Sequence, residues 1–506
     1  MLPYCLAMEN SANQQKTFDD DVATLQAMGY RQELLRRMSG FSNYAISLSI
    51  ICILAGGITS FQLALCATGG AGVTFGWPLM SLIALAFAAT MGQVASAFPT
   101  AGGLYHWAAI LGGNGWGWVT AWFNLAGLIT VLAAINVGTF EFCIGSLGVI
   151  LGPEFTEQIA ASKPFWQLGI VLAITVSQAY FNHRGIRVTT WLTDFNGYLI
   201  LVAALALTAA LVWFAPRWDF AQLVTFTNYS GLPEGESPVW PRQDSLGLLF
   251  ALGLMLPAYT ITGFDASAHT SEETLGAART VPKSIVRAVW VSGLFGWIML
   301  MAVVLAIPDM DAAVAQGGNA FYWTVDQVLP KPLAIVLLAS IAVAQYICGL
   351  ATVTSASRMI FAFARDGGLP FSKTLRRVST AHQTPDAAIW TAALLSVAFT
   401  VFTPVYSTIT TVCVIFLYIS YVIPTFLGLL AYGNRWTVMG PWSLGRWYRP
   451  LAAVCLLGGI GIYLIGVQPP NDKALWITIG ACVLLAVIWF AFTRRTFSGP
   501  PHIKRL

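Results

Sequence analysis

The sequence predicts an all-α polytopic membrane protein with about twelve transmembrane helices. Of its 506 residues, 57% are hydrophobic and only 9% are charged. A soluble globular domain carries about 25% charged residues, so this chain has too few to cover a water-facing surface. The apolar residues gather in stretches of about 20, the length that crosses a bilayer as a helix. These stretches lack the alternation of a membrane β-strand, so helices embedded in a lipid bilayer are the class expected.

Twelve apolar segments divide the chain into a core, two additional helices and two tails. A cytosolic N-terminal tail over 1–42 includes a short amphipathic helix near 25–38, and helices 1–10 form a core over 43–430. Helices 11 and 12 occupy 431–494, and 495–506 is a cytosolic C-terminal tail. The segments lie near 43–65, 73–95, 115–140, 166–183, 188–213, 245–265, 285–307, 332–360, 386–403, 405–430, 450–468 and 474–493.

The basic residues predict the orientation. With the N-terminus placed in the cytosol, about four in five of the 26 Lys and Arg residues fall on the cytosolic side, as the positive-inside rule requires. The other side receives only Lys163, Arg217, Arg242, Lys331 and Lys473. Both termini are therefore expected in the cytosol, with the chain integral to a plasma or inner membrane. No run of basic residues indicates a nucleic-acid partner.

The first segment contains two adjacent glycines, Gly56 and Gly57, followed by Thr59 and Ser60 near the bilayer midplane. Glycine costs about 1 kcal/mol in a helix interior relative to alanine. An interrupted backbone in lipid is tolerated where it faces a cavity or a ligand, which would make this a binding site. Small residues can also simply permit close helix packing, and this segment alone does not separate the two explanations.

The sixth segment supports the first explanation. Pro257 lies at mid-depth, followed by Thr260, Thr262, Gly263 and Asp265. Two interrupted helices five segments apart indicate a 5+5 inverted repeat, with discontinuous helices 1 and 6 and two extra helices. Amides at half-helix N-termini would meet an anionic group, and free carbonyls would meet an ammonium group or a cation. This geometry favours a zwitterion.

Three motifs resemble one family of permeases. They are GQVASAFPTAGGLYHWAA over 92–109, GFDASAHTSEETLGAARTVPKSIVRAV over 263–289 and SRMIFAFARDGGLP over 357–370. Their order and spacing are similar to those of the amino acid–polyamine–organocation superfamily, most closely its amino acid/choline transporter branch. The family usually carries an acidic residue where this chain has Gln93.

The resemblance implies a secondary active transporter, a symporter or antiporter, that moves a small amine-bearing solute by alternating access. An amino acid such as γ-aminobutyrate or an α-amino acid is expected, and choline or a polyamine is the alternative within the same fold. A non-transporting membrane sensor or a membrane enzyme is the alternative from another class. An enzyme is not expected, because the five histidines are scattered over loops and helix ends: His106, His183, His269, His382 and His502.

The predicted substrate-binding residues surround the two interruptions, with Phe264 covering the site. They are Ala55, Gly56, Gly57, Ile58, Thr59, Asn124, Tyr259, Thr260, Thr262, Gly263, Phe264, Asp265 and Tyr346. A carboxylate in a membrane segment is costly, so Asp265 is predicted to contact the substrate amine, a proton or a gate. A hydrated carboxylate capping the second half-helix is the simpler alternative. Helix–helix hydrogen bonding explains Asn124 equally well.

Charged residues near the cytosolic side form a predicted inner gate. Glu272 and Glu273 are expected to pair there with Arg358 or Arg365, and solvated charges are the alternative. No cofactor is expected beyond a coupling ion, Na⁺ or H⁺. Thr352 and Ser355 on the eighth segment are candidate sodium ligands, although packing explains them equally well. The fifth segment lacks the lysine that some proton-coupled relatives carry, which favours a sodium site or a facilitator.

Overall fold

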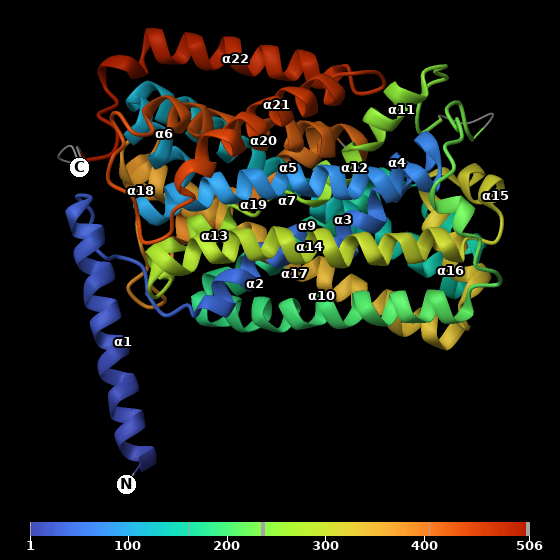
Figure 1. Ribbon diagram of the computed structural model, residues 1–506, viewed down its shortest axis with the longest axis horizontal. Helices are drawn as coiled ribbons and strands as arrows, with labels where there is room; N and C mark the ends of the chain where they lie inside the picture. The colour runs from blue at the N-terminus through green and yellow to red at the C-terminus, as the bar shows by residue number, and fades with distance from the viewer. Residues whose placement is uncertain (1, 161, 234–237, 404, 502–506) are drawn as a thin grey trace.

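The computed structural model describes residues 2–160, 162–233, 238–403 and 405–501. The helices of this part run roughly parallel as one bundle, and α1 projects from one end of it (Figure 1). Nine of the described helices are long and apolar enough to cross a membrane, and two shorter apolar ones cover Leu246–Thr260 and Asp386–Phe402. The predicted class, an integral membrane protein built of helices, is confirmed.

Each of the twelve predicted segments forms one helix or a set of short helices. The first is α2 (Gly40–Ile51), α3 (Ile53–Thr59) and α4 (Phe61–Thr68), and the sixth is α11 (Leu246–Gly253), α12 (Met255–Thr260) and α13 (Ala266–His269). The others are α5 (Gly70–Ala97), α7 (Asn114–Leu151), α9 (Lys163–His183), α10 (Ile186–Phe214), α14 (Ala277–Ala306), α17 (Lys331–Arg365), α19 (Asp386–Phe402), α20 (Tyr406–Ala431), α21 (Tyr448–Gly466) and α22 (Lys473–Ala491).

The remaining helices lie in the connections and at the N-terminus. The α-helices are α1 (Leu2–Ala27), α6 (Leu104–Gly112), α8 (Pro153–Ala160), α15 (Met310–Ala315), α16 (Ala320–Val328) and α18 (Ser372–Leu375). The 3₁₀ helices are η1 (Phe220–Leu223), η2 (Ser271–Glu273), η3 (Gly317–Asn319), η4 (Gly445–Trp447) and η5 (Thr493–Arg495).

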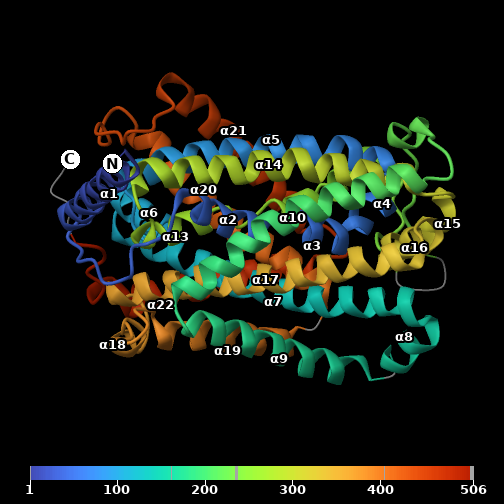
Figure 2. The same cartoon turned by 90° about the horizontal axis from the view of Figure 1, so that it is seen from below.

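Four of the five pairs of helices that lie five segments apart pack against one another. The second packs against the seventh (α5 and α14), the third against the eighth (α7 and α17) and the fourth against the ninth (α9 and α19). The first and sixth meet through α3 with α12 and through α2 with α13. Figure 2 shows α9 and α19 side by side along one edge of the bundle. This pairing is the arrangement that two repeated five-helix halves produce.

The first helix is interrupted at Cys52 and again at Ser60, and not at the adjacent glycines. Cys52 has φ 29° and ψ 78°, which ends α2, and α3 then continues through Gly56. A Cβ on Gly56 would lie 3.1 Å from Oγ1 of Thr260 on α12. The predicted position of the first interruption is therefore wrong. Gly56 permits the close crossing of the first and sixth helices, the packing role that the sequence left open.

The interruption of the sixth helix lies where the sequence placed it. Helix α12 ends at Thr260 and α13 begins at Ala266. Between them Gly263 adopts φ +79°, a conformation that glycine tolerates and other residues rarely adopt. A Cβ on Gly263 would overlap Cγ2 of Ile50, so the two interrupted helices approach closely here as well.

The N-terminal segment differs from the prediction. Helix α1 ends at Ala27, and residues 28–39 are irregular, so the amphipathic helix predicted over 25–38 is wrong. Tyr30 and Met38 are nevertheless buried. The Met38 amide donates to the carbonyl of Glu273 (2.8 Å), and the Leu275 amide donates to the carbonyl of Met38 (3.0 Å). These bonds to the exit of the sixth helix replace the intrahelical bonds that a helix would have supplied.

Candidate functional site

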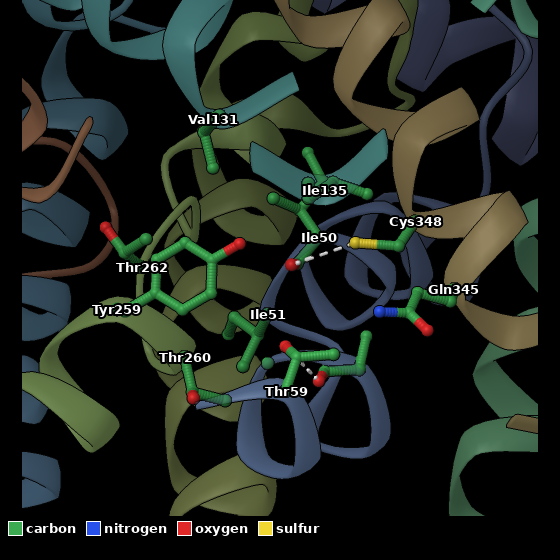
Figure 3. Close-up of a pocket in the computed structure, with 12 residues that line it drawn as sticks. Ile50, Ile51, Thr59, Val131, Ile135, Tyr259, Thr260, Thr262, Gln345 and Cys348 are labelled. Carbon is green, nitrogen blue, oxygen red and sulfur yellow. Dashed lines mark hydrogen bonds between the residues drawn. The ribbon is translucent and has the colours of Figure 1, made fainter. Parts of the chain in front are cut away.

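A pocket lies where the two interrupted helices meet the third and eighth helices (Figure 3). It is lined by Ile50, Ile51, Ala55, Gly56, Thr59, Val131, Ile135, Tyr259, Thr260, Thr262, Gln345 and Cys348. Six of these were predicted from the sequence: Ala55, Gly56, Thr59, Tyr259, Thr260 and Thr262. The free space is narrow, with room for little more than a water molecule. The pocket is therefore in a contracted form, and its walls must separate to admit a solute.

Two tyrosine side chains meet beside Thr59 of the pocket lining. The hydroxyls of Thr59 and Tyr406 lie 2.8 Å apart, and the Thr59 hydroxyl also contacts the carbonyl of Ala55. The ring of Tyr259 meets that of Tyr406 edge-on, with centroids 6.2 Å apart. Tyr406 begins α20 and was missed by the sequence analysis. Its neighbours come from other segments of the chain, and no local pattern brings them together.

The eighth helix presents Gln345, not Tyr346, to the pocket. The Tyr346 hydroxyl lies 2.9 Å from the Ser177 hydroxyl on α9, so the prediction that Tyr346 binds substrate is not supported. Gln345 is 1% exposed, and its Oε1 has no hydrogen-bond partner within the described part of the chain. Figure 3 shows its amide turned toward the pocket. Successive residues of a helix point about 100° apart, so an error of one residue selects a different face.

Asp265 lies behind the pocket wall, in a fully buried polar cluster. The Tyr421 hydroxyl donates to Oδ1 of Asp265 (2.7 Å), and the Asn124 amide donates to Oδ2 (3.1 Å). Nε2 of His269 lies 3.2 Å from the same Oδ2. The amide of Gly263 donates to the Tyr421 hydroxyl (3.2 Å), which connects the cluster to the interruption of the sixth helix. The structure thus brings Asp265 and Asn124 together, but away from the pocket lining.

The other predicted residues lie outside the pocket lining. Phe264 is buried against the ring of Tyr421 and is not part of the pocket lining, so its role as a cover stays a prediction. A Cβ on Gly57 would face Met299 and Leu300 of α14. Ile58 is buried in the hydrophobic core. These positions lie on the faces of their helices that pack against protein, which sequence proximity to an interruption does not reveal.

Two ion pairs lie beyond the cluster, toward the bundle end where α1 and α18 lie. Nε and Nη2 of Arg358 donate to the two carboxylate oxygens of Glu273 (3.0 and 2.9 Å), and both residues are fully buried. Nη1 and Nη2 of Arg365 donate to Glu272 (3.0 and 2.8 Å). The Arg365 guanidinium also lies 3.9 Å from the centroid of the Tyr30 ring. The predicted carboxylates and guanidiniums are paired here, and the solvated-charge alternative does not hold for the buried pair.

The candidate sodium ligands bond within their own helix. The Thr352 hydroxyl donates to the carbonyl of Cys348 (2.9 Å), and the Ser355 hydroxyl donates to the carbonyl of Ala351 (3.5 Å). Their oxygens retain lone pairs, so a sodium site at these residues remains a prediction.

Comparison with known proteins identifies relatives along most of the chain. A family model described as amino acid permease matches residues 38–494. The amino-acid permease BAT1 of Arabidopsis thaliana is 30% identical, over 95% of this chain and 96% of its own. Its homolog in Oryza sativa subsp. japonica is also 30% identical, with the same coverage. The GABA-specific permease of Saccharomyces cerevisiae is 27% identical, over 74% of this chain and 65% of its own.

Proposed function

Because the chain belongs to the amino acid permease family, we propose that it carries a small zwitterionic amino acid through the pocket between its interrupted helices. The family consists of transporters and not enzymes, so the question left is which solute is carried and how. The proposal rests on one observation: both interrupted helices contribute walls to a single buried pocket.

The chemistry of the walls supports an uncharged amino acid side chain. None of the described lining residues carries a charge, and the polar groups are hydroxyls and one amide: Thr59, Tyr259, Thr260, Thr262 and Gln345. A choline or polyamine site would need a carboxylate or several aromatic faces around the cation. Tyr259 is the one aromatic ring among the described residues of this lining. Backbone groups at the interruptions are suited to the two charges of a zwitterion.

The barriers at the two ends of the pocket support alternating access. One barrier is the contact between Thr59, Tyr259 and Tyr406. The other includes the Glu272–Arg365 and Glu273–Arg358 pairs and the N-terminal segment packed on them. We assign the second barrier to the cytosolic side, because the positive-inside rule places both termini there. The γ-aminobutyrate of the yeast relative and an α-amino acid are both within this proposal.

Counterflow in proteoliposomes tests the proposed function. Vesicles are loaded with unlabelled solute and diluted into the same labelled solute, with α-amino acids, γ-aminobutyrate, choline and putrescine in separate arms. We expect transient accumulation of at least one neutral amino acid. Accumulation of choline or putrescine alone would support the cationic alternative. Saturable binding of an amino acid without counterflow would indicate a sensor.

The Gln345→Leu variant tests the pocket itself. A lost hydrogen bond to a charged substrate group costs about 1.5–3 kcal/mol, which corresponds to an affinity weaker by about 10- to 100-fold. Titration of the purified protein with the transported amino acid measures this change. Tyr346→Phe is the matched control on the neighbouring position and is expected to bind as the unsubstituted protein does. Equal affinity of Gln345→Leu and Tyr346→Phe would contradict the assignment of the pocket.

A further inference from the structure

The buried cluster behind the pocket contains a carboxylate without a permanent positive partner. Glu272 and Glu273 are each paired with an arginine. Asp265 is equally buried, and its ion-pair partner within the described chain is His269, with both side chains 0% exposed. Histidine is the side chain whose charge changes near neutral pH. The Asp265–His269 pair is thus a place beside the pocket where charge can change.

Hydrogen bonding around His269 fixes where its protons lie. Nδ1 is 3.1 Å from the carbonyl oxygen of Ala101, and a carbonyl oxygen only accepts. Nδ1 must therefore carry a hydrogen. In a neutral imidazole the other nitrogen then carries none and is an acceptor.

With the hydrogen on Nδ1, the contact between His269 and Asp265 requires one further proton. Nε2 of His269 and Oδ2 of Asp265 are 3.2 Å apart. If both groups were deprotonated there, two lone pairs would face each other in a buried site, and the contact would be repulsive. One proton must lie between them, either on the imidazole, which is then cationic, or on the carboxyl group. The observed contact is the proton-loaded form of the pair.

We propose that Asp265 and His269 form a one-proton site, and that the proton bound there is the coupling ion of transport. The inference rests on the proposed function, since coupling requires a transported solute. It places the proton-binding group on the sixth helix. Some proton-coupled relatives instead carry a lysine on the fifth helix, which this sequence lacks. The proposed site also selects H⁺ from the two coupling ions that the sequence left open.

The elements around the pair offer groups suited to both of its states. Tyr421 of α20 donates to Oδ1 of Asp265, and Asn124 of α7 donates to Oδ2. The Oδ1 of Asn124 is buried with no hydrogen-bond partner in the described chain, so the amide can also offer an acceptor to a protonated carboxyl group. Asn43 and Ser47 of α2 face the same short helix through Ser267 and carry no titratable group.

The charges of the other titratable groups nearby are balanced by neighbouring side chains. Glu272 and Glu273 follow on the same segment, with Arg365 and Arg358 of α17. From α6, His106 pairs with Asp366 (3.0 Å), to which Tyr30 and Tyr105 also donate. Each glutamate has an arginine partner, and the positive charge of Arg365 also acts on Asp366. His269 is the ion-pair partner of Asp265 within the described chain, so a proton bound there changes the charge balance of the cluster.

The proton connects the elements that must separate when the cytosolic side opens. His269 bonds the carbonyl of Ala101 in the loop before α6, and the Ala101 amide donates to Glu272 (3.1 Å). Tyr421 links Asp265 to the amide of Gly263 at the interruption. Loss of the proton would make the central contact repulsive and loosen all of these connections. Proton binding thus favours the closed cytosolic side, and proton release accompanies its opening.

Proteoliposomes of the full chain, prepared without sodium, test the proposal. With an external pH one unit lower than the internal pH, one proton per substrate allows about tenfold accumulation of the amino acid that shows counterflow. An internal pH dye should report acidification when that amino acid is added. Asp265→Asn and His269→Gln should lose accumulation and acidification, while counterflow at equal pH continues at a reduced rate. His382→Gln, on the cytosolic loop, is the matched control and should accumulate normally.

A second measurement needs no substrate. Because the closed form holds the proton, the melting temperature of the unsubstituted protein should fall as the pH rises, and Asp265→Asn should flatten this dependence. Identical pH profiles for the two proteins would overturn the proton site. Accumulation driven by a sodium gradient, or by neither gradient, would overturn the coupling while leaving the proposed function intact. Absence of counterflow for every amino acid would contradict the proposed function, and the melting profile would still decide the proton site.

Discussion

Replacement of Gly263 by alanine is expected to abolish transport and to destabilise the protein. Gly263 has φ +79°, and an L-residue in the left-handed region costs roughly 1–2 kcal/mol. The added Cβ would also overlap Cγ2 of Ile50, and overpacking costs about 1–3 kcal/mol. Both effects act where the first and sixth helices meet at the pocket. Counterflow and the melting temperature in detergent measure the two consequences.

A glycine with open surroundings provides the matched control. A Cβ added to Gly480 of α22 would have no neighbouring heavy atom within 4 Å, so Gly480→Ala should transport and melt as the unsubstituted protein does. Adding Ile50→Ala to Gly263→Ala should recover part of the stability, because it removes the overlap and leaves the backbone strain. Full activity of Gly263→Ala alone would show that transport does not depend on the backbone conformation of Gly263.

The second large effect is expected from the buried Glu273–Arg358 pair. Arg358→Met removes a guanidinium that donates two hydrogen bonds to Glu273, both residues being fully buried. A carboxylate left alone in such a place destabilises a protein by about 3–5 kcal/mol. We expect a melting temperature lower by several degrees and poor recovery of folded protein, measured by size-exclusion chromatography and thermal unfolding in detergent.

The double variant separates lost charge compensation from lost packing. Arg358→Met with Glu273→Gln removes both charges, so its stability should exceed that of Arg358→Met alone. Arg376→Met, just after α18, changes the same residue type where the side chain is exposed to solvent and should have little effect. A double variant as unstable as Arg358→Met would show that packing, and not the uncompensated carboxylate, explains the loss.

Much of the fold could be predicted because membrane insertion imposes strong local constraints. Each spanning helix needs its own apolar stretch, so Pro257 and Gly263 stand out as an interruption of the sixth helix. The first interruption was misplaced because a glycine in a membrane helix can mark either a break in the helix or a close contact with another helix. At Gly56 it admits Thr260 of the crossing helix, while the chain breaks at Cys52, a residue type that signals no interruption.

The sequence predicted which helices line the pocket, but not which face of each helix does so. Thr59, Thr260 and Thr262 were found because they adjoin the interruptions. Gln345 and Tyr406 were missed, since their place at the pocket follows from how α17 and α20 are rotated about their axes. That rotation depends on tertiary packing, which leaves no periodic signal in a helix surrounded on all sides by apolar residues. The partners of Asp265 include residues of distant segments and are likewise invisible in sequence order.

The two proposed barriers are held by different kinds of contact, and this difference affects the rate of transport. Opening past Tyr406 separates uncharged side chains, namely the hydroxyl contact with Thr59 and the ring contact with Tyr259. Opening past the sixth-helix exit separates charged side chains and detaches the backbone of Met38 from Glu273 and Leu275. We therefore expect the larger activation free energy at the end of the bundle that carries the ion pairs. With the termini in the cytosol, we expect opening at that end to limit turnover, so that the transport rate rises steeply with temperature.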